Sequence, residues 1–353
     1  MRAYRLVDFG SFEHLKVGEE EQPIAGRGEV LIKVHATSLN YRDIAMARGQ
    51  YPLEHRAGLI PLSDGAGEVV AVGAEVSALA VGDRVVNSFH PRWFGGDPPP
   101  DAGQDQYGSS RDGWLTEYKV ASQEAVVAFP DHLSYEEAAT LPCAAATAWS
   151  ALTYGTPIGP GKTVLTLGTG GVSLFAIQLA KLAGADVIAT TSSAEKAQRL
   201  TGLGVDHVID YSEVSAWGER ALELTGGRGV HRVVEIGGSG TLGQSMRACG
   251  VGGEIALIGF LASSEPTLDF FEVFSSGATF RVLSVGDRSG LTNLLAAVGQ
   301  AELRPVINGV FPFDDVTAAY HRLASGEGMG KVVVSVSQPH SDQESLTKGE
   351  THV

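Results

Sequence analysis

The sequence is poor in cysteine, has no long apolar run, and lacks an excess of positive charge. Cys143 and Cys249 are the only cysteines among 353 residues, so we expect no disulfide framework and a reducing, cytoplasmic location. No apolar run is long enough to cross a bilayer, and residues 1–6 (MRAYRL) do not begin a signal peptide. The formal charge of −15 argues against nucleic acid and anionic membranes as partners.

The order of strand-type and helix-type runs predicts an α/β protein with two domains. Residues 1–130 contain short β-type runs at 30–35, 67–73 and 83–86, separated by glycine, which favour a barrel-like β domain. Residues 91–111 are rich in glycine, proline and aspartate and predict a long loop. Residues 131–284 alternate between strand and helix patterns, which indicates a parallel sheet. The apolar segment 134–147 predicts a helix, and residues 134–137 (SYEE) resemble its N-terminal cap. Residues 285–353 return to the first domain, and we expect the polar segment 338–353 to be a disordered tail.

The segment 163–181 (TVLTLGTGGVSLFAIQLAK) predicts a strand, a glycine-rich turn and a helix. Such a turn presents backbone N–H groups at the positive end of a helix dipole and binds a pyrophosphate. Gly168 permits the tight turn, Gly170 lets phosphates approach the backbone, and Ser173 is small enough for the helix to pack on the strand. An ordinary glycine turn fits too, but further strands at 186–191 and 206–210 favour a dinucleotide site. The candidate residues are Gly168, Thr169, Gly170, Gly171, Val172 and Ser173.

The end of the second strand favours NADP(H) over NAD(H). NAD sites usually place a carboxylate there, about 20 residues beyond the glycines, to bind the ribose hydroxyls. This chain has Thr191, Ser192 and Ser193 instead, followed by Lys196. Small hydroxyls and a lysine suit a 2′-phosphate. Both serines are also good helix-capping residues, and the two roles are compatible.

Several segments resemble signatures of the medium-chain dehydrogenase/reductase superfamily. They are residues 66–73 (AGEVVAVG), 81–85 (VGDRV), 112–118 (DGWLTEY), 138–142 (AATLP), 168–173 and 330–333 (GKVV). The resemblance covers about residues 1–336. It implies a Rossmann doubly wound parallel sheet, a GroES-like β domain that carries the catalytic residues, and a homodimer in which residues 278–285 form an edge strand. It also implies cofactor contacts from Thr147, Tyr211, Gly237, Gly259, Phe260, Ser284, Val285 and Lys331.

The same resemblance allows the residues at the catalytic zinc-ligand positions to be compared. Alcohol dehydrogenases of the superfamily bind catalytic zinc through two cysteines and a histidine, and the corresponding residues here are Asn40, Ser63 and Cys143. Asparagine and serine are weak, neutral ligands, and one cysteine alone does not hold zinc, so we expect no metal. Asn40 with Asp43 resembles the zinc-independent quinone oxidoreductases. In that subfamily Ser192, Lys196 and Tyr211 fall where the 2′-phosphate end of NADPH is held.

Without a metal there is no Lewis acid to polarise a simple ketone, so an electrophilic acceptor is favoured. We predict hydride transfer from NADPH to a quinone or an α,β-unsaturated carbonyl compound. The developing oxyanion needs hydrogen-bond donors, and the candidates are Asn40, Tyr41, Arg42 and Ser63. Tyr41 would point away from the substrate if its segment is helical. Asp43 is a further candidate, although carboxylates at such positions more often fix a helix start.

Two other functions fit the same residues. One is an NADP-dependent alcohol dehydrogenase or aldehyde reductase of the superfamily that retains Cys143. The other is an NADPH-binding protein with little turnover.

Overall fold

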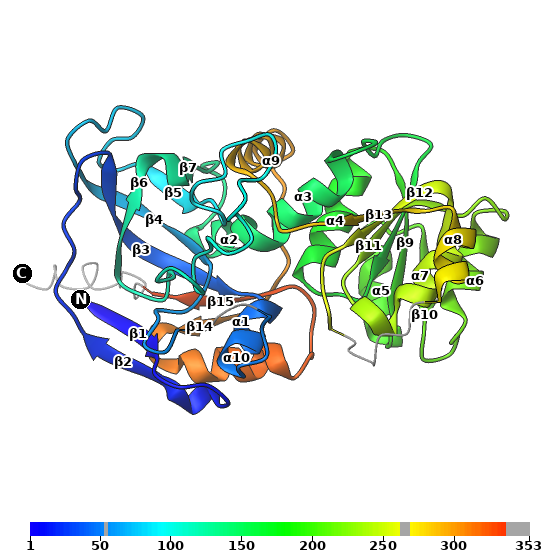
Figure 1. Cartoon of the computed structure of the whole chain (residues 1–353), viewed down its shortest axis with the longest axis horizontal. Coiled ribbons are helices and arrows are strands. Elements are labelled where there is room, and N and C mark those ends of the chain that lie inside the picture. Colours follow the sequence, from blue (N-terminus) through cyan, green and yellow to red (C-terminus); the bar gives the residue numbers. More distant parts are fainter. Residues whose placement is uncertain (53–55, 262–268, 337–353) are drawn as a thin grey trace, which may run out of the picture.

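The two lobes of the molecule lie side by side, with the first and last parts of the chain in one lobe and the middle in the other (Figure 1). The structure is a computed structural model that describes residues 1–52, 56–261 and 269–336. The expected tail at 338–353 lies outside these residues. Among the described residues, no helix combines the length and the apolar character that a membrane span requires.

The middle lobe is a doubly wound parallel sheet, as predicted. Its six strands run in the order β10-β9-β8-β11-β12-β13 and pair in parallel throughout. Chain order reverses between β8 and β11, which is the place where such sheets bind nucleotides. The strands are β8 (Thr163–Leu167), β9 (Asp186–Thr191), β10 (His207–Asp210), β11 (Val230–Glu235), β12 (Cys249–Leu257) and β13 (Thr279–Val282). The helices are α3 (Ala146–Thr153), α4 (Gly171–Leu182), α5 (Ala194–Gly202), α6 (Trp217–Leu224), α7 (Leu242–Ala248) and α8 (Phe270–Ser276), with a 3-10 turn η4 (Gly238–Gly240).

The other lobe is built around a seven-stranded sheet with the order β14-β15-β3-β4-β5-β7, with β6 paired to β3. Its strands are β3 (Glu29–Leu39), β4 (Asp64–Val72), β5 (Arg84–Asn87), β6 (Tyr118–Ser122), β7 (Val126–Ala128), β14 (Ile307–Pro312) and β15 (Lys331–Ser335). A separate hairpin joins β1 (Arg2–Leu6) to β2 (Leu15–Glu19). The remaining helical segments of this lobe and of the junction are α1 (Tyr41–Ala47), α2 (Tyr135–Ala138), α9 (Arg288–Gln300), α10 (Val316–Ala324), η1 (Phe12–His14), η2 (Gln123–Ala125) and η5 (Phe313–Asp315). The antiparallel pairing of β15 with β3 places the end of the described chain in the same sheet as its first part.

The apolar segment 134–147 is less regular than the single helix that its pattern suggests. Ser134 and Glu137 form the expected capping box, in which the Glu137 N–H donates to Ser134 Oγ at 3.2 Å. The helix α2 then gives way to a wide π-helical turn, η3 (Leu141–Ala145), before α3 begins. Pro142 has no N–H to donate, so a regular α-helix loses a hydrogen bond there. The wide turn carries Cys143 to the junction between the lobes.

A backbone contact fixes the end of the first lobe against the glycine turn of the second. The Gly330 N–H donates to the Thr169 carbonyl at 3.1 Å, and Gly330 forms an isolated bridge with Gly170. Gly330 has φ +98°, and a Cβ there would lie 2.1 Å from the Val306 carbonyl oxygen, so only glycine fits. The contact brings the first residue of β15 to the start of α4.

The predicted long loop at 91–111 contains no helix or strand. Asp105 anchors it through ion pairs with Arg92 at 2.5 Å and with Arg111. The loop also accepts a hydrogen bond at the start of α9, where the Arg288 N–H donates to the Trp93 carbonyl at 2.9 Å. Ion pairs and backbone contacts therefore order this segment.

Candidate functional site

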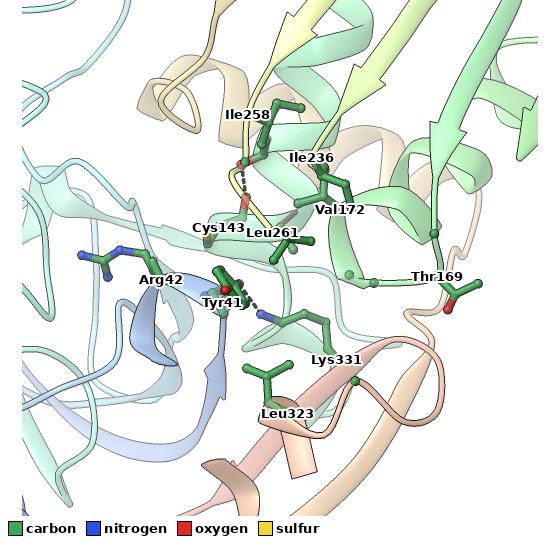
Figure 2. A pocket seen from close by; sticks show the side chains of 18 of the residues that line it. Tyr41, Arg42, Cys143, Thr169, Val172, Ile236, Ile258, Leu261, Leu323 and Lys331 are labelled. Atoms are coloured by element: carbon green, nitrogen blue, oxygen red, sulfur yellow. Dashed lines mark hydrogen bonds between the residues drawn. The ribbon is translucent and has the colours of Figure 1, made fainter. Parts of the chain in front are cut away.

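A cavity of about 560 Å³ lies between the two lobes, and it runs from the glycine turn to a group of aromatic side chains. Figure 2 shows residues of both lobes that line it. Most of the predicted site residues contribute to its wall. They are Asn40, Tyr41, Arg42, Thr147, Gly168, Thr169, Gly170, Gly171, Val172, Ser192, Lys196, Tyr211, Gly259, Phe260, Ser284, Val285 and Lys331. Asp43, Ser63, Ser173, Ser193 and Gly237 do not line it.

One end of the cavity is formed by the glycine turn. Gly168 adopts the left-handed conformation, with φ +68°, and Gly170 is the N-cap of α4. The first N–H groups of a helix have no partner inside it, and here Gly171 and Val172 line the cavity. Ser173 points into the protein interior instead of the cavity. Its hydroxyl donates a hydrogen bond to the Leu167 carbonyl at 2.6 Å, which connects α4 to β8. The turn therefore has the form that a dinucleotide pyrophosphate requires.

Hydroxyl groups and one lysine line the cavity at the end of β9. Thr191 is only 1 % exposed, and its Oγ1 has no hydrogen-bond partner among the described residues. Ser192 and Tyr211 lie in the same wall, as does Lys196, whose ammonium donates to the Gly326 carbonyl at 3.3 Å. Ser193 instead caps α5, where its Oγ accepts a hydrogen bond from the Lys196 N–H.

Carboxylates are scarce in this wall. Among the described residues that line the cavity, Glu327 is the one carboxylate, and it is paired with Arg322 at 3.1 Å. An orphaned buried hydroxyl beside a serine and a lysine fits the phosphorylated ribose of NADP(H).

Two predicted residues beyond β11 and β13 differ in their roles. Gly237 belongs to a tight turn, where its N–H donates to the buried Glu235 carboxylate at 2.7 Å and a Cβ would lie 2.3 Å from Thr241 Oγ1. Ser284 lies in the cavity wall, and its carbonyl oxygen is 2.9 Å from His90 Nε2. The histidine thus links the first lobe to the segment that follows β13.

Aromatic side chains line the opposite end of the cavity. Tyr41 is the first residue of α1 and does line the cavity, so the expectation that a helix would turn it away is wrong. Its ring meets that of Phe260 edge-on, with the ring centroids 5.8 Å apart, and the centroid of the Tyr51 ring lies 6.1 Å from that of Phe260. These contacts join α1 of one lobe to the segment after β12 of the other. The result is an apolar, aromatic pocket suited to a planar molecule.

The Arg42 side chain is already occupied by the protein. Its guanidinium lies between the rings of Tyr51 and Phe89, at 5.3 and 5.1 Å. It donates to the Tyr107 carbonyl at 3.0 Å and to Gln106 Oε1 at 3.2 Å. Arg42 therefore supports the pocket by fixing the loop that covers it.

A buried polar cluster separates the glycine turn from the aromatic pocket. Asn40 Nδ2 donates to Asp64 Oδ2 at 2.9 Å and contacts Ser63 Oγ at 3.4 Å. The Ser63 hydroxyl donates to Asp64 Oδ1 at 2.7 Å. Lys331 completes the cluster, since its ammonium donates to Asn40 Oδ1 at 2.5 Å and to the Leu39 carbonyl at 2.7 Å. The same ammonium lies 3.5 Å from Asp64 Oδ2.

Asp43 has a structural position behind this cluster. Its Oδ2 accepts a hydrogen bond from the Asn40 N–H at 2.7 Å, which fixes the first turn of α1. Burial raises the pKa of Asp43 to about 6, although the nearby Arg42 guanidinium acts in the opposite direction. Because the carboxyl group does not line the cavity, it is not placed to exchange a proton with a ligand.

The donor atoms of the cluster do not suit zinc. The amide of Asn40 and the hydroxyl of Ser63 are held by Asp64, and an ammonium group lies among them. Burial raises the pKa of the Cys143 thiol far above its usual value, whereas zinc binds the thiolate. Over the part of the chain that the structure describes, no group of three or more His, Cys, Asp or Glu side chains is arranged to hold a metal.

Comparisons with known proteins agree with this architecture. Residues 26–131 match the family model of the alcohol dehydrogenase GroES-like domain, and residues 171–300 match that of the zinc-binding dehydrogenases. A zinc-type alcohol dehydrogenase-like protein of Schizosaccharomyces pombe is 40% identical over 337 residues, which is 93% of this chain and 97% of that protein.

Solved structures give the same result. A Sinorhizobium meliloti protein described as an alcohol dehydrogenase superimposes with a TM-score of 0.89 and 37% identity, over 95% of this chain and 98% of that one. Two mycobacterial structures, one complexed with NADPH and one described as a quinone oxidoreductase, superimpose with TM-scores of 0.81 and 0.77. Both are 30% identical, and each match covers 95% of this chain and 100% of the other. The chain belongs to the medium-chain dehydrogenase/reductase superfamily and is an oxidoreductase.

Asp64 is a residue of the site that the sequence did not single out, and Thr191 was named only as part of the hydroxyl-rich end of its strand. Asp64 directly follows Ser63 and opens β4, so a buried carboxylate beside a predicted polar position was the available signal. Thr191 is the last residue of β9, where a ligand-facing side chain is expected in a doubly wound sheet.

Replacing Gly170 by alanine separates folding from nucleotide binding. Gly170 has φ −77°, and a Cβ there would meet no atom within 4 Å, so we expect the thermal unfolding midpoint of Gly170→Ala to stay within about 1 °C. The added methyl group would face a bound pyrophosphate, so the dissociation constant for NADPH should rise at least about tenfold. Fluorescence titration and thermal unfolding measure the two effects.

Gly202→Ala is the matched control, because a Cβ at Gly202 also meets nothing within 4 Å and this position lies at the far end of α5. Both quantities should be unchanged in it. Tight NADPH binding by Gly170→Ala would show that the turn is not the pyrophosphate site.

Proposed function

We propose that the protein transfers hydride from NADPH to a quinone or an α,β-unsaturated carbonyl compound without a metal ion. The observation that carries this proposal is the continuity of one cavity, which joins a dinucleotide turn to an aromatic pocket across a cluster with Lys331 at its centre. The cluster holds Asn40 and Ser63, two of the three residues that stand at the zinc-ligand positions of the superfamily's alcohol dehydrogenases. An ammonium cation among them disfavours a divalent cation at the same place.

The residues of the cavity divide into a cofactor end and an acceptor end. NADPH supplies the hydride when it is bound. The turn at 168–172 would hold its pyrophosphate, and Thr191, Ser192, Lys196 and Tyr211 would hold the phosphorylated ribose. A mycobacterial relative of the same fold is described as complexed with NADPH, which supports this choice of cofactor.

The acceptor end favours planar, conjugated compounds. Tyr41, Tyr51, Phe89 and Phe260 present ring surface, and the Arg42 guanidinium donates hydrogen bonds to the loop at 106–107. Quinones and enones accept a hydride without prior activation by a Lewis acid, because conjugation spreads the negative charge onto oxygen. The mycobacterial quinone oxidoreductase is a relative with this kind of acceptor.

A second candidate is oxidation of an alcohol or reduction of an aldehyde. Relatives described as alcohol dehydrogenases, including the Sinorhizobium meliloti protein, favour it. The lack of a second cysteine or a histidine beside Cys143 among the described residues speaks against the metal that such a reaction needs.

The test of the proposal is oxidation of NADPH by a panel of quinones, enones, aldehydes and ketones, together with metal analysis of the purified protein. We expect turnover with quinones or enones, weak turnover with simple aldehydes and ketones, less than about 0.1 zinc per chain, and no loss of activity after treatment with a chelator. About one zinc per chain with activity on alcohols would favour the second candidate. Binding of NADPH without turnover of any acceptor would identify a binding protein instead.

Replacing Lys196 by methionine tests the choice of cofactor. The change removes the cation at the ribose end of the cavity and keeps the length of the side chain. We expect kcat/KM for NADPH to fall about tenfold to 100-fold, because a charge-assisted hydrogen bond to phosphate is lost. The value for NADH should change little, and an equal loss for both cofactors would contradict a 2′-phosphate role.

We also propose a homodimer. The strand β13 is the last strand of its sheet, and Val282 on it is 80 % exposed. The neighbouring helix α8 exposes Phe270, Phe271 and Phe274 to more than two-thirds of their area. An open strand beside such an apolar helix face is a surface that pairing of two copies would cover. Sedimentation at micromolar concentration should give twice the mass of the chain, and a monomer would refute the proposal.

A further inference from the structure

We propose that the ammonium group of Lys331 stabilises the negative charge that forms on the acceptor's oxygen. The inference rests on the proposed function and assigns Lys331 a role at the acceptor, whereas the family resemblance implies only a contact with the cofactor.

The direction of the side chain is the first observation. The stem of Lys331 packs against the glycine turn, since a Cβ at Gly171 would lie 2.6 Å from Lys331 Cδ. The side chain then continues past the turn, and its ammonium reaches Asn40 Oδ1 and the Leu39 carbonyl. Figure 2 shows it directed toward Tyr41, on the side of the cavity that also carries Cys143. The positive charge therefore lies between the turn and the aromatic pocket.

The second observation is that the donors of Asn40 and Ser63 are occupied within the polar cluster. Both N–H groups of the Asn40 amide have acceptors, in Asp64 Oδ2 and Ser63 Oγ. The Ser63 hydroxyl donates to Asp64 and does not line the cavity.

Arg42 is bound to the loop at 106–107, and in Figure 2 its guanidinium points away from Lys331. An ammonium has three N–H groups, and Lys331 uses two of them in these hydrogen bonds. Lys331 therefore retains an N–H group that makes no hydrogen bond, with Asp64 Oδ2 at 3.5 Å, and it lines the cavity together with Asn40, Tyr41 and Arg42.

The third observation is the setting of the charge. Lys331 is 3 % exposed, so water screens it little, and a charge in such a place acts more strongly on a neighbouring oxyanion than one at the surface. Asp64, which is fully buried, lies 3.5 Å away and balances the charge while the site is free of ligand. The ammonium thus supplies at this centre the positive charge that zinc supplies in metal-dependent members of the superfamily.

The reaction balances with Lys331 in this role. The acceptor gains a hydride, which is one proton with two electrons, at its electrophilic carbon, and the reduced nicotinamide is oxidised. The electron pair of the carbon–carbon double bond shifts toward the carbonyl, and its oxygen becomes an oxyanion. Lys331 donates a hydrogen bond to this oxygen, and a proton from water completes the product. The lysine keeps its own proton throughout.

The experiment compares Lys331→Met with Lys196→Met and with the wild-type protein. If Lys331 acts at the acceptor, Lys331→Met should bind NADPH with nearly unchanged affinity in a fluorescence titration, while kcat falls. The fall in kcat should be about 100-fold with an enone and much smaller with a quinone. A quinone accepts negative charge more readily and so depends less on stabilisation of its oxyanion by Lys331. Lys196→Met should show the opposite pattern, with weaker NADPH binding and little change in kcat. Lys331→Arg, which keeps the charge, should restore part of the enone activity.

A second measurement uses the unaltered protein and so does not depend on the folding of a variant. 4-Nitrophenol bound with NADP⁺ should be held as the yellow phenolate at a pH where the free compound is mostly neutral. Binding as the neutral phenol would overturn the proposal, and so would a Lys331→Met protein that loses NADPH affinity but keeps the wild-type ratio of enone to quinone rates. If the wild-type protein reduces no acceptor, the proposed function itself fails, and the phenolate measurement still decides whether Lys331 stabilises an oxyanion.

Discussion

The site depends on one backbone contact, in which Gly330 approaches the glycine turn at Thr169 and Gly170. Because the contact holds the start of β15 against the start of α4, the next residue, Lys331, must pass over Gly171. The side chain of Lys331, which belongs to the first lobe, thereby packs against the glycine turn of the nucleotide lobe. The aromatic contacts of Tyr41 and Tyr51 with Phe260 close the same junction from the far side. The residues of both contacts line the cavity.

The sequence predicted the elements of the nucleotide lobe well, because their signals are local. The runs at 163–167 and 186–191 are strands with those bounds, and the strand expected at 206–210 begins one residue later, at His207. The helical run at 134–147 is divided, since Pro142 interrupts a pattern that apolar spacing alone describes as continuous. The spacing of apolar residues shows which face of a helix is buried. It does not show where a backbone hydrogen bond of the helix is missing.

The candidate site was predicted as a set of positions but not as a network. The link between Asn40 and Lys331 spans 291 residues, so no local pattern contains it. The sequence also could not show that Asp64 occupies the donors of Asn40 and Ser63, because a hydrogen bond between side chains depends on how the strands and α1 pack together. The same geometry explains Tyr41: the first two residues of its helix, Tyr41 and Arg42, line the cavity at the junction, whereas residues 43–47 are buried and do not line it.

The pairing of β15 with β3 also determines the order in which the lobes can be completed during synthesis. The strands of the nucleotide lobe follow one another along the chain from Thr163 to Val282, so that lobe can form as soon as these residues leave the ribosome. The sheet of the other lobe remains open beside β3 until Lys331–Ser335 has been made. The part of the molecule that is synthesised first is thus finished last, and during this interval an exposed strand edge must be kept from pairing with other chains.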